Sequence, residues 1–192
     1  MKLTSMTLTA IALVALTIPL RAQTGLFVGA QVTGASLDYR EAAEKLDFGS
    51  GFGVHAGLML GSSFGVIANY DKNTLGAAGG DTDLGQWDLL GRLGLMGIGP
   101  VRTYLTGGIT GRAAKSPTFN GNPGDYDFSG INPTGGVAAQ VFVTNKLAID
   151  GSVLWTFGKF SDATNGSLGA GRVEATGSRV SVGASWYLLG GK

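Results

Sequence analysis

Hydrophobic and polar residues alternate with a period of two along most of this chain. The clearest example is the stretch 179–188, in which Val180, Val182 and Trp186 fall on one face while Arg179 and Ser181 fall on the other. A period of two is typical of a β-strand whose two faces meet different surroundings. Residues 179–188 therefore predict a strand with one apolar and one polar face.

The same alternation recurs in seven further segments, which begin near Leu26, Gly51, Phe64, Trp87, Val101, Gly136 and Leu147. Each is close to the roughly 9–11 residues that a tilted strand needs to cross a bilayer. The connections alternate between long ones (36–50, 72–86, 113–133 and 159–172) and short ones (61–63, 97–100 and 144–146). The pattern predicts an all-β fold, an eight-stranded antiparallel up-and-down transmembrane β-barrel. Its apolar face meets lipid, its polar face lines the interior, and its long loops lie outside the cell.

The aromatic residues on the apolar faces gather at two levels. Five fall near the long loops and two near the short turns; in chain order the seven are Phe52, Phe64, Tyr70, Trp87, Trp155, Phe157 and Trp186. Phe64 and Trp186 are the pair near the short turns. Two rings of aromatic side chains at headgroup depth are typical of a membrane barrel. We therefore predict that these seven side chains lie at the membrane interfaces.

The composition fits this prediction and narrows the function classes. The chain has 192 residues, 34 of them Gly, and 14% are charged, against about 25% in an average soluble domain. It has no Cys, so a thiolate metal site and a cysteine nucleophile are excluded. The sequence has no long run of like charge, which argues against a nucleic-acid partner.

The first 22 residues read as a cleavable signal peptide. Lys2 precedes a mostly apolar run from Met6 to Ile18, which is too short to span a bilayer as a helix. We predict cleavage after Ala22, export, and a single barrel domain over residues 23–192 in the bacterial outer membrane.

With these features the chain resembles the small eight-stranded outer-membrane β-barrel proteins of the OmpA/OmpX-like kind, over essentially all of residues 23–188. The last strand is also similar to the C-terminal assembly signal of that family, at Ser181, Gly183, Trp186 and Leu188. The resemblance implies two partners: outer-membrane lipids, and the outer-membrane assembly machinery acting on this strand. The chain departs from the family pattern in lacking a terminal aromatic residue.

Any chemistry would have to lie on the inward faces. The inward polar residues are His55, Asn69, Asp71, Asp88, Arg92, Arg102, Tyr104, Gln140, Asp150 and Arg179. Unpaired charges are costly inside so narrow a barrel. We therefore predict an interior charge network of Asp88, Arg92, Arg102, Asp150 and Arg179, with His55, Asn69, Tyr104 and Gln140 as further polar lining. A narrow pore, with water beside the inward glycines, is the alternative.

We expect no enzyme activity, cofactor or metal site. The single histidine, His55, lies near mid-strand, and the sequence shows no Ser and carboxylate partners for it. The predicted function is a non-catalytic structural or surface-interaction role, adhesion-like, through the long loops. A narrow pore for small solutes is the alternative, and a secreted soluble β-barrel that binds an apolar ligand is the third possibility.

Overall fold

The computed structural model describes residues 24–39, 46–77, 80–119, 122–165, 168–169 and 173–190. The signal peptide predicted over residues 1–22 lies outside these ranges. Among the described residues, no helix has the length and apolar character needed to cross a membrane.

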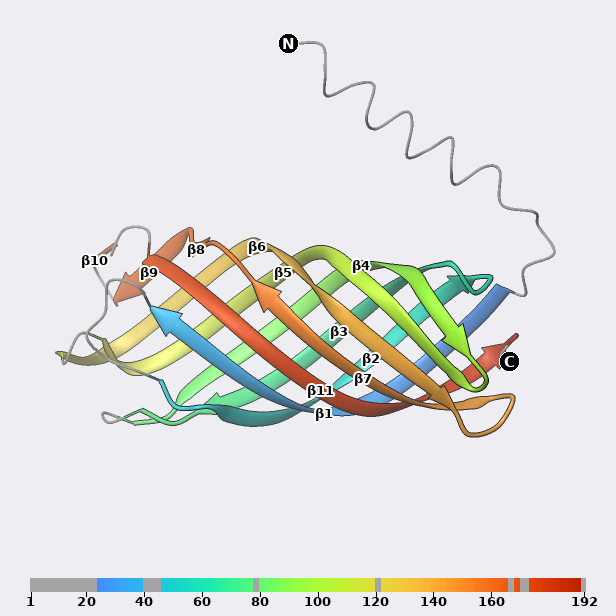
Figure 1. Ribbon diagram of the computed structural model, residues 1–192. Coiled ribbons are helices and arrows are strands. Elements are labelled where there is room, and N and C mark those ends of the chain that lie inside the picture. Colours follow the sequence, from blue (N-terminus) through green and yellow to red (C-terminus); the bar gives the residue numbers. More distant parts are fainter. Residues whose placement is uncertain are drawn as a thin grey trace, which may run out of the picture.

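In the described part of the chain, eight long strands form a closed antiparallel ring (Figure 1). They are β1 (Thr24–Tyr39), β2 (Gly49–Leu60), β3 (Phe64–Leu75), β4 (Thr82–Ile98), β5 (Val101–Phe119), β6 (Asn122–Phe142), β7 (Leu147–Thr156) and β11 (Val173–Leu189). Each strand pairs with the next along the chain, β7 pairs with β11, and β11 pairs with β1. Because the ring is closed, this wall has no open strand edge. A β-structure must meet this condition to lie in lipid. The predicted eight-stranded barrel is confirmed.

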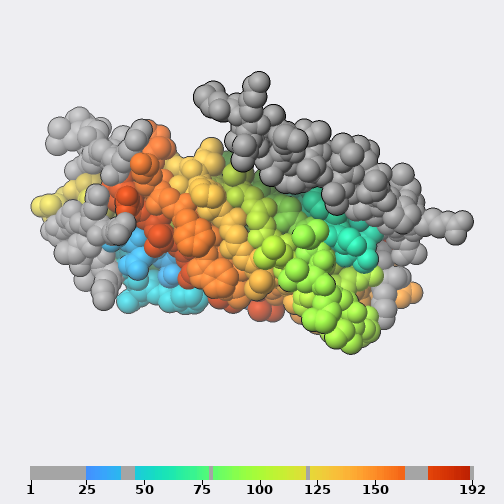
Figure 2. All heavy atoms as spheres, turned by 45° about the horizontal axis from the view of Figure 1, so that its top comes forward, coloured from blue at the N-terminus to red at the C-terminus, as the bar shows by residue number. Residues whose placement is uncertain are grey.

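The predicted direction of each strand face is also confirmed. Val182 is 54% exposed on the outer wall, whereas its neighbour Ser181 is 7% exposed inside. The other strands of the ring show the same alternation over most of their length, with interruptions at 94–98 on β4 and 107–112 on β5. Packed side chains of β5, β6 and β7 form a continuous outer wall on the face shown in Figure 2. This apolar wall does not fit a secreted soluble barrel.

The two ends of the barrel differ in their connections. At one end, which we call the short-turn end, tight turns join β2 to β3, β4 to β5 and β6 to β7. Gly61 and Gly99 adopt φ values of 71° and 58° in two of these turns, a backbone conformation that glycine tolerates best. The opposite, long-loop end carries three further short strands: β8 (Lys159–Phe160), β9 (Asp162–Asn165) and β10 (Leu168–Gly169). Strand β8 pairs with β11, and β9 pairs with β6.

The lengths of the strands and of the long loops were predicted wrongly. Strands β5 and β6 have 19 and 21 residues, and they take up most of the segment 113–133 that was expected to be a loop. The reason is that the alternation continues: Ala114 and Ser116 on β5, and Tyr126 and Phe128 on β6, still point inward and are buried. The barrel wall therefore extends beyond the apolar belt at the long-loop end.

The interior contains two separate apolar clusters. The long-loop cluster consists of Ala35, Leu37, Tyr39, Leu75, Leu84, Ala114, Tyr126, Phe128, Phe160, Val173 and Ala175. The short-turn cluster consists of Phe27, Met59, Ile67, Leu90, Tyr104, Ala138, Phe142, Ala148, Leu154 and Tyr187. Polar side chains occupy the strand positions between the two clusters and form the candidate site.

Candidate functional site

A buried ion-pair network lies between the two apolar clusters. Arg179 on β11 reaches across the interior to β3 and β4. Its Nη1 lies 2.6 Å from Oδ1 of Asp71, and its Nη2 donates to Oδ2 of Asp88. We call these three residues the central network. The sequence placed all three on inward faces, but Asp71 was not among the expected network members.

Every carboxylate oxygen of the central network has a hydrogen-bond donor. Asn73 Nδ2 donates to the second oxygen of Asp71 at 2.7 Å. Asp88 accepts hydrogen bonds from Asn69 Nδ2 at 3.0 Å and from Thr110 Oγ1 at 2.6 Å. Such satisfaction is the condition under which buried charges are tolerated. The network is therefore a brace that ties β11 to β3, β4 and β5.

Arg112 on β5 lies between this network and the long-loop cluster. It directly precedes the segment 113–133 that was expected to be a loop, and it was not among the predicted inward residues. Its Nη2 donates to Asn132 Oδ1 at 2.6 Å and to the Ala175 carbonyl at 2.9 Å. Its guanidinium lies 4.9 Å from the centre of the Phe160 ring. Asn132 Nδ2 in turn donates to the Lys159 carbonyl. Strand β8 is thus held against the wall with Phe160 turned inward.

A second polar group, the short-turn polar layer, is embedded in the short-turn cluster. It consists of His55, Arg92, Tyr104, Gln140, Asp150, Ser185 and Tyr187. Gln140 Oε1 accepts hydrogen bonds from the hydroxyls of Tyr104 at 3.1 Å and Tyr187 at 3.0 Å. Its Nε2 donates to Asp150 Oδ1 at 2.6 Å. Gln140 is therefore the centre of this layer.

The structure divides the five residues of the expected charge network between these layers. Arg179 and Asp88 meet in the centre, whereas Arg92 and Asp150 lie in the short-turn polar layer. Arg92 Nε and Nη1 have no hydrogen-bond partner among the described residues, and its guanidinium lies 5.7 Å from the Tyr104 ring centre. The Arg102 guanidinium lies over the Phe142 ring at 4.8 Å. Neither arginine forms an ion pair within 4.0 Å in the described part of the chain.

Two inward glycines, Gly29 and Gly57, accommodate neighbouring rings, so the space beside them is not free for water. Gly29 faces His55 on β2 and Ser185 on β11 in the strand register. A Cβ atom at Gly29 would lie 2.3 Å from His55 Nε2. Similarly, a Cβ at Gly57 would lie 2.4 Å from Cζ of Phe27. At these two positions the interior is therefore filled by side chains.

His55 lies close to a serine and a carboxylate, contrary to the expectation from the sequence. Its Nε2 lies 2.7 Å from Ser185 Oγ and 3.9 Å from Asp150 Oδ2, while Nδ1 has no partner among the described residues. In a catalytic relay the acid binds the ring nitrogen opposite the serine. Here both approach the same nitrogen, and Ser185 is 0% exposed. The arrangement does not present an activated nucleophile to a substrate.

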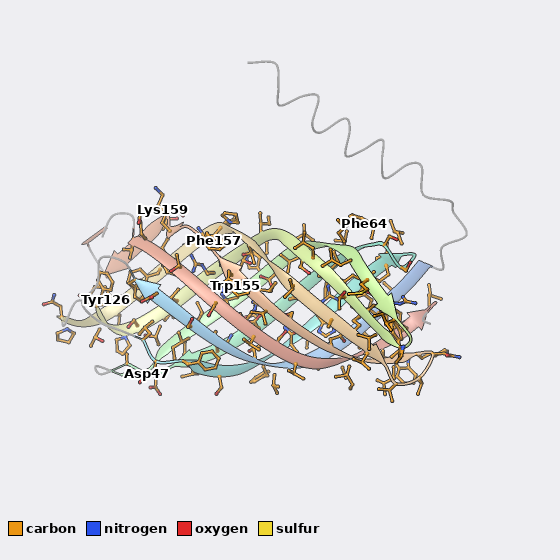
Figure 3. All side chains as sticks on the ribbon, in the orientation of Figure 1. Asp47, Phe64, Tyr126, Trp155, Phe157 and Lys159 are labelled. Atoms are coloured by element: carbon orange, nitrogen blue, oxygen red, sulfur yellow. The ribbon has the colours of Figure 1, made fainter. Side chains whose placement is uncertain are left out.

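The outer wall carries the predicted aromatic residues. Phe52, Tyr70, Trp87, Trp155, Phe157 and Trp186 are exposed, and Phe64 is half-buried. Figure 3 shows Phe64 toward the short-turn end, with Trp155 and Phe157 nearer the long-loop end. Trp87 covers Gly111, where a Cβ atom would be 2.1 Å from the indole ring. Among the described residues, no group of three or more His, Asp or Glu side chains is placed to hold a metal ion.

A closed ring with an apolar outer wall and an interior filled by side chains defines a small transmembrane β-barrel. The chain belongs to the outer membrane protein beta-barrel domain family, whose sequence pattern matches residues 6–186. It is a protein of the bacterial outer membrane. No curated protein sequence matches it.

Solved structures show the same fold. Neisserial surface protein A is 17% identical, with 84% of this chain and 96% of that chain covered and a TM-score of 0.57. The outer membrane protein OprG of Pseudomonas aeruginosa is 12% identical, with 87% and 96% covered and a TM-score of 0.59. Ail, the attachment invasion locus protein of Yersinia pestis, is 14% identical, with 87% and 99% covered and a TM-score of 0.55. At these identities the likeness concerns the fold alone.

Proposed function

We propose that this outer-membrane barrel is a closed, non-catalytic scaffold whose long-loop end faces outward and makes surface contacts. The observation that carries the proposal is the filled interior. Two apolar clusters flank a central network in which all four carboxylate oxygens accept hydrogen bonds. Opening a path for ions would require Arg179 to leave both Asp71 and Asp88, which leaves buried charges unpaired.

Conductance tests the closed interior. The protein is refolded, its closed-barrel state is checked by heat-modifiable gel migration, and it is inserted into planar bilayers. We expect a stable baseline. Regular unitary steps from the folded protein would overturn the closed-scaffold proposal in favour of the pore.

Among the described residues, the β5–β6 hairpin, with strands of 19 and 21 residues, is the longest hairpin that reaches the long-loop end. Ser116 and Tyr126 face each other across the two strands. Residues 117–125 can therefore be replaced by Asn-Gly, which favours a two-residue hairpin turn. We expect cells that express this variant to lose adhesion to an epithelial monolayer while the barrel still folds. The matched control is the same Asn-Gly replacement made at residues 144–146, at the short-turn end. Equal adhesion by both variants and the unaltered protein would contradict the surface role.

Charge indicates the class of partner. The four long connections (36–50, 72–86, 113–133 and 159–172) together contain nine acidic and six basic residues. Ail has been solved with the heparin analogue sucrose octasulfate. The net negative charge here favours a cationic or neutral partner over such a polyanion. We expect the folded protein to pass through a heparin column at physiological salt, and retention there would contradict this choice.

A further inference from the structure

The outer wall has a groove of about 1150 Å³ at the long-loop edge of its apolar belt. It crosses the outer faces of β11, β1, β2, β3, β4 and β5. Val32, Val180, Val182 and Phe52 line its apolar part. These side chains are exposed on the face that meets lipid. This part of the groove therefore opens toward the hydrocarbon of the membrane.

The groove is hollow because small residues meet in one band of the wall. Gly34, Ser50, Gly85 and Ala113 lie on four different strands and line the groove. Phe48 lies over Gly34, where a Cβ atom would be 2.3 Å from the Phe48 ring. Larger side chains at Ser50, Gly85 and Ala113 would fill the depression.

The polar end of the groove carries two lysines. Lys72 on β3 is exposed and forms no ion pair within 4.0 Å among the described residues. Lys115 on β5 lies 3.4 Å from Asp127, with the two side chains 78% and 57% exposed. Such an exposed pair is worth at most about 1 kcal/mol, so Lys115 can change partners at little cost. Asp83, opposite Lys115 in the register, is the opposing charge in the groove.

We propose that this groove binds a membrane lipid with an anionic, phosphate-bearing headgroup. The acyl chain lies along Val32, Val180 and Val182, and the phosphate lies at Lys72 with Lys115 as the second cation. The apolar part of the groove, which we call the trough, leads to lysines at the edge of the apolar belt. This arrangement fits a molecule with an acyl chain and an anionic headgroup. Lysines near a membrane surface attract such headgroups. A free anion would leave the apolar trough uncovered. The proposal rests on the outer-membrane location and is independent of the closed-scaffold role.

Lipid retention tests the proposal. The detergent-purified barrel is mixed with phosphatidylglycerol or with phosphatidylcholine of the same acyl chains, and bound lipid is measured by native mass spectrometry. We expect preferential retention of phosphatidylglycerol. Lys72→Gln should reduce it about fivefold, the factor expected of one lysine near an anionic headgroup. Asp83→Asn should increase retention, because it removes the opposing charge.

The matched control is Lys159→Gln, which removes the same charge from β8, outside the groove lining. In Figure 3, Lys159 and Asp47, the neighbour of Phe48, lie on opposite sides of the barrel at the long-loop end. Equal losses from Lys72→Gln and Lys159→Gln would overturn the proposal. So would competition by inorganic phosphate alone, which would indicate a site for the free anion. Val180→Trp tests the apolar part of the groove separately: it should abolish retention while both lysines remain.

Discussion

The two polar layers inside this barrel differ in how well their charges are matched. In the central network, Arg179 lies between two carboxylates whose oxygens all have donors. In the short-turn polar layer, Arg92 Nε and Nη1 and Asp150 Oδ2 have no hydrogen-bond partner among the described residues. Both layers are buried, so burial alone does not show which charged residues stabilise the barrel. The ion-pair and hydrogen-bond partners of each charge show it.

The difference follows from the surroundings of each arginine. Arg179 faces the polar side chains of β3 and β4, where Asp71, Asp88 and Gln86 are within hydrogen-bond reach. Arg92 faces the rings of the short-turn cluster and lies near the Tyr104 face. The first arginine is expected to stabilise the fold strongly, and the second to contribute little.

Arg179→Met should have the largest effect. It leaves the carboxylates of Asp71 and Asp88 buried without their cation, and breaking a buried pair in this way costs about 3–5 kcal/mol. Reversible urea unfolding of the barrel in lipid vesicles measures the loss. A loss below about 1 kcal/mol would show that the central network does not brace the barrel.

The control for this prediction adds Asp71→Asn and Asp88→Asn to Arg179→Met. Asn keeps the shape of Asp, and the triple variant has no uncompensated charge in the central network. We expect it to regain at least half of the stability lost by Arg179→Met. If the triple variant is less stable than the single one, the loss comes from packing and not from charge.

Tyr104→Phe should have an intermediate effect, in the short-turn polar layer. The variant removes one hydrogen bond to Gln140 Oε1, but the Tyr187 hydroxyl still donates to the same atom at 3.0 Å. The acceptor is not orphaned, so the loss should be about 0.5–1.5 kcal/mol. The same urea titration measures it, with Tyr187→Phe as the matched variant. A loss above 3 kcal/mol in either would place the main brace in this layer.

Arg92→Met should have the smallest effect. Methionine keeps an unbranched side chain in the cluster and removes a buried charge whose Nε and Nη1 have no protein partner among the described residues. We expect the free energy of unfolding to change by less than about 1 kcal/mol, because the substitution breaks no ion pair within 4.0 Å among the described residues and removes two buried donors that lack acceptors. Lys159→Met, at an exposed site, is the reference. A loss of unfolding free energy equal to that of Arg179→Met would show that the two layers contribute equally to stability.

The sequence was sufficient to predict the barrel and the face of each residue, because the period of two is a local signal. Val182 and Ser181 are adjacent, and their opposite exposures were predictable from the alternation alone. The strand ends were not predictable in this way. Tyr126 and Phe128 continue the alternation beyond the membrane, but the Gly, Asn and Pro residues around them resemble a loop.

The partners across the interior could not be predicted, because they depend on how far neighbouring strands are staggered. Asp150 was expected to act together with Arg179, and it lies on β7, next to β11. In the register, however, Asp150 faces Gly183, four residues from Arg179, a separation of about 13 Å along a strand. Asp71 and Asp88, on strands that are not neighbours of β11, are the residues that Arg179 reaches. Recognition of Ser181, Gly183, Trp186 and Leu188 by the assembly machinery stays a prediction.

The pairing of β1 with β11 also constrains how the molecule is made. These strands come from opposite ends of the sequence, so their contact is the last one available to a chain synthesised from its N-terminus. Contacts so distant in sequence form slowly. Until β11 arrives, the free side of β1 carries unpaired amide and carbonyl groups that hydrocarbon cannot accommodate. A polypeptide truncated before residue 173 would lack β11 and could not close the ring. We therefore expect it to fail to integrate into the membrane at all.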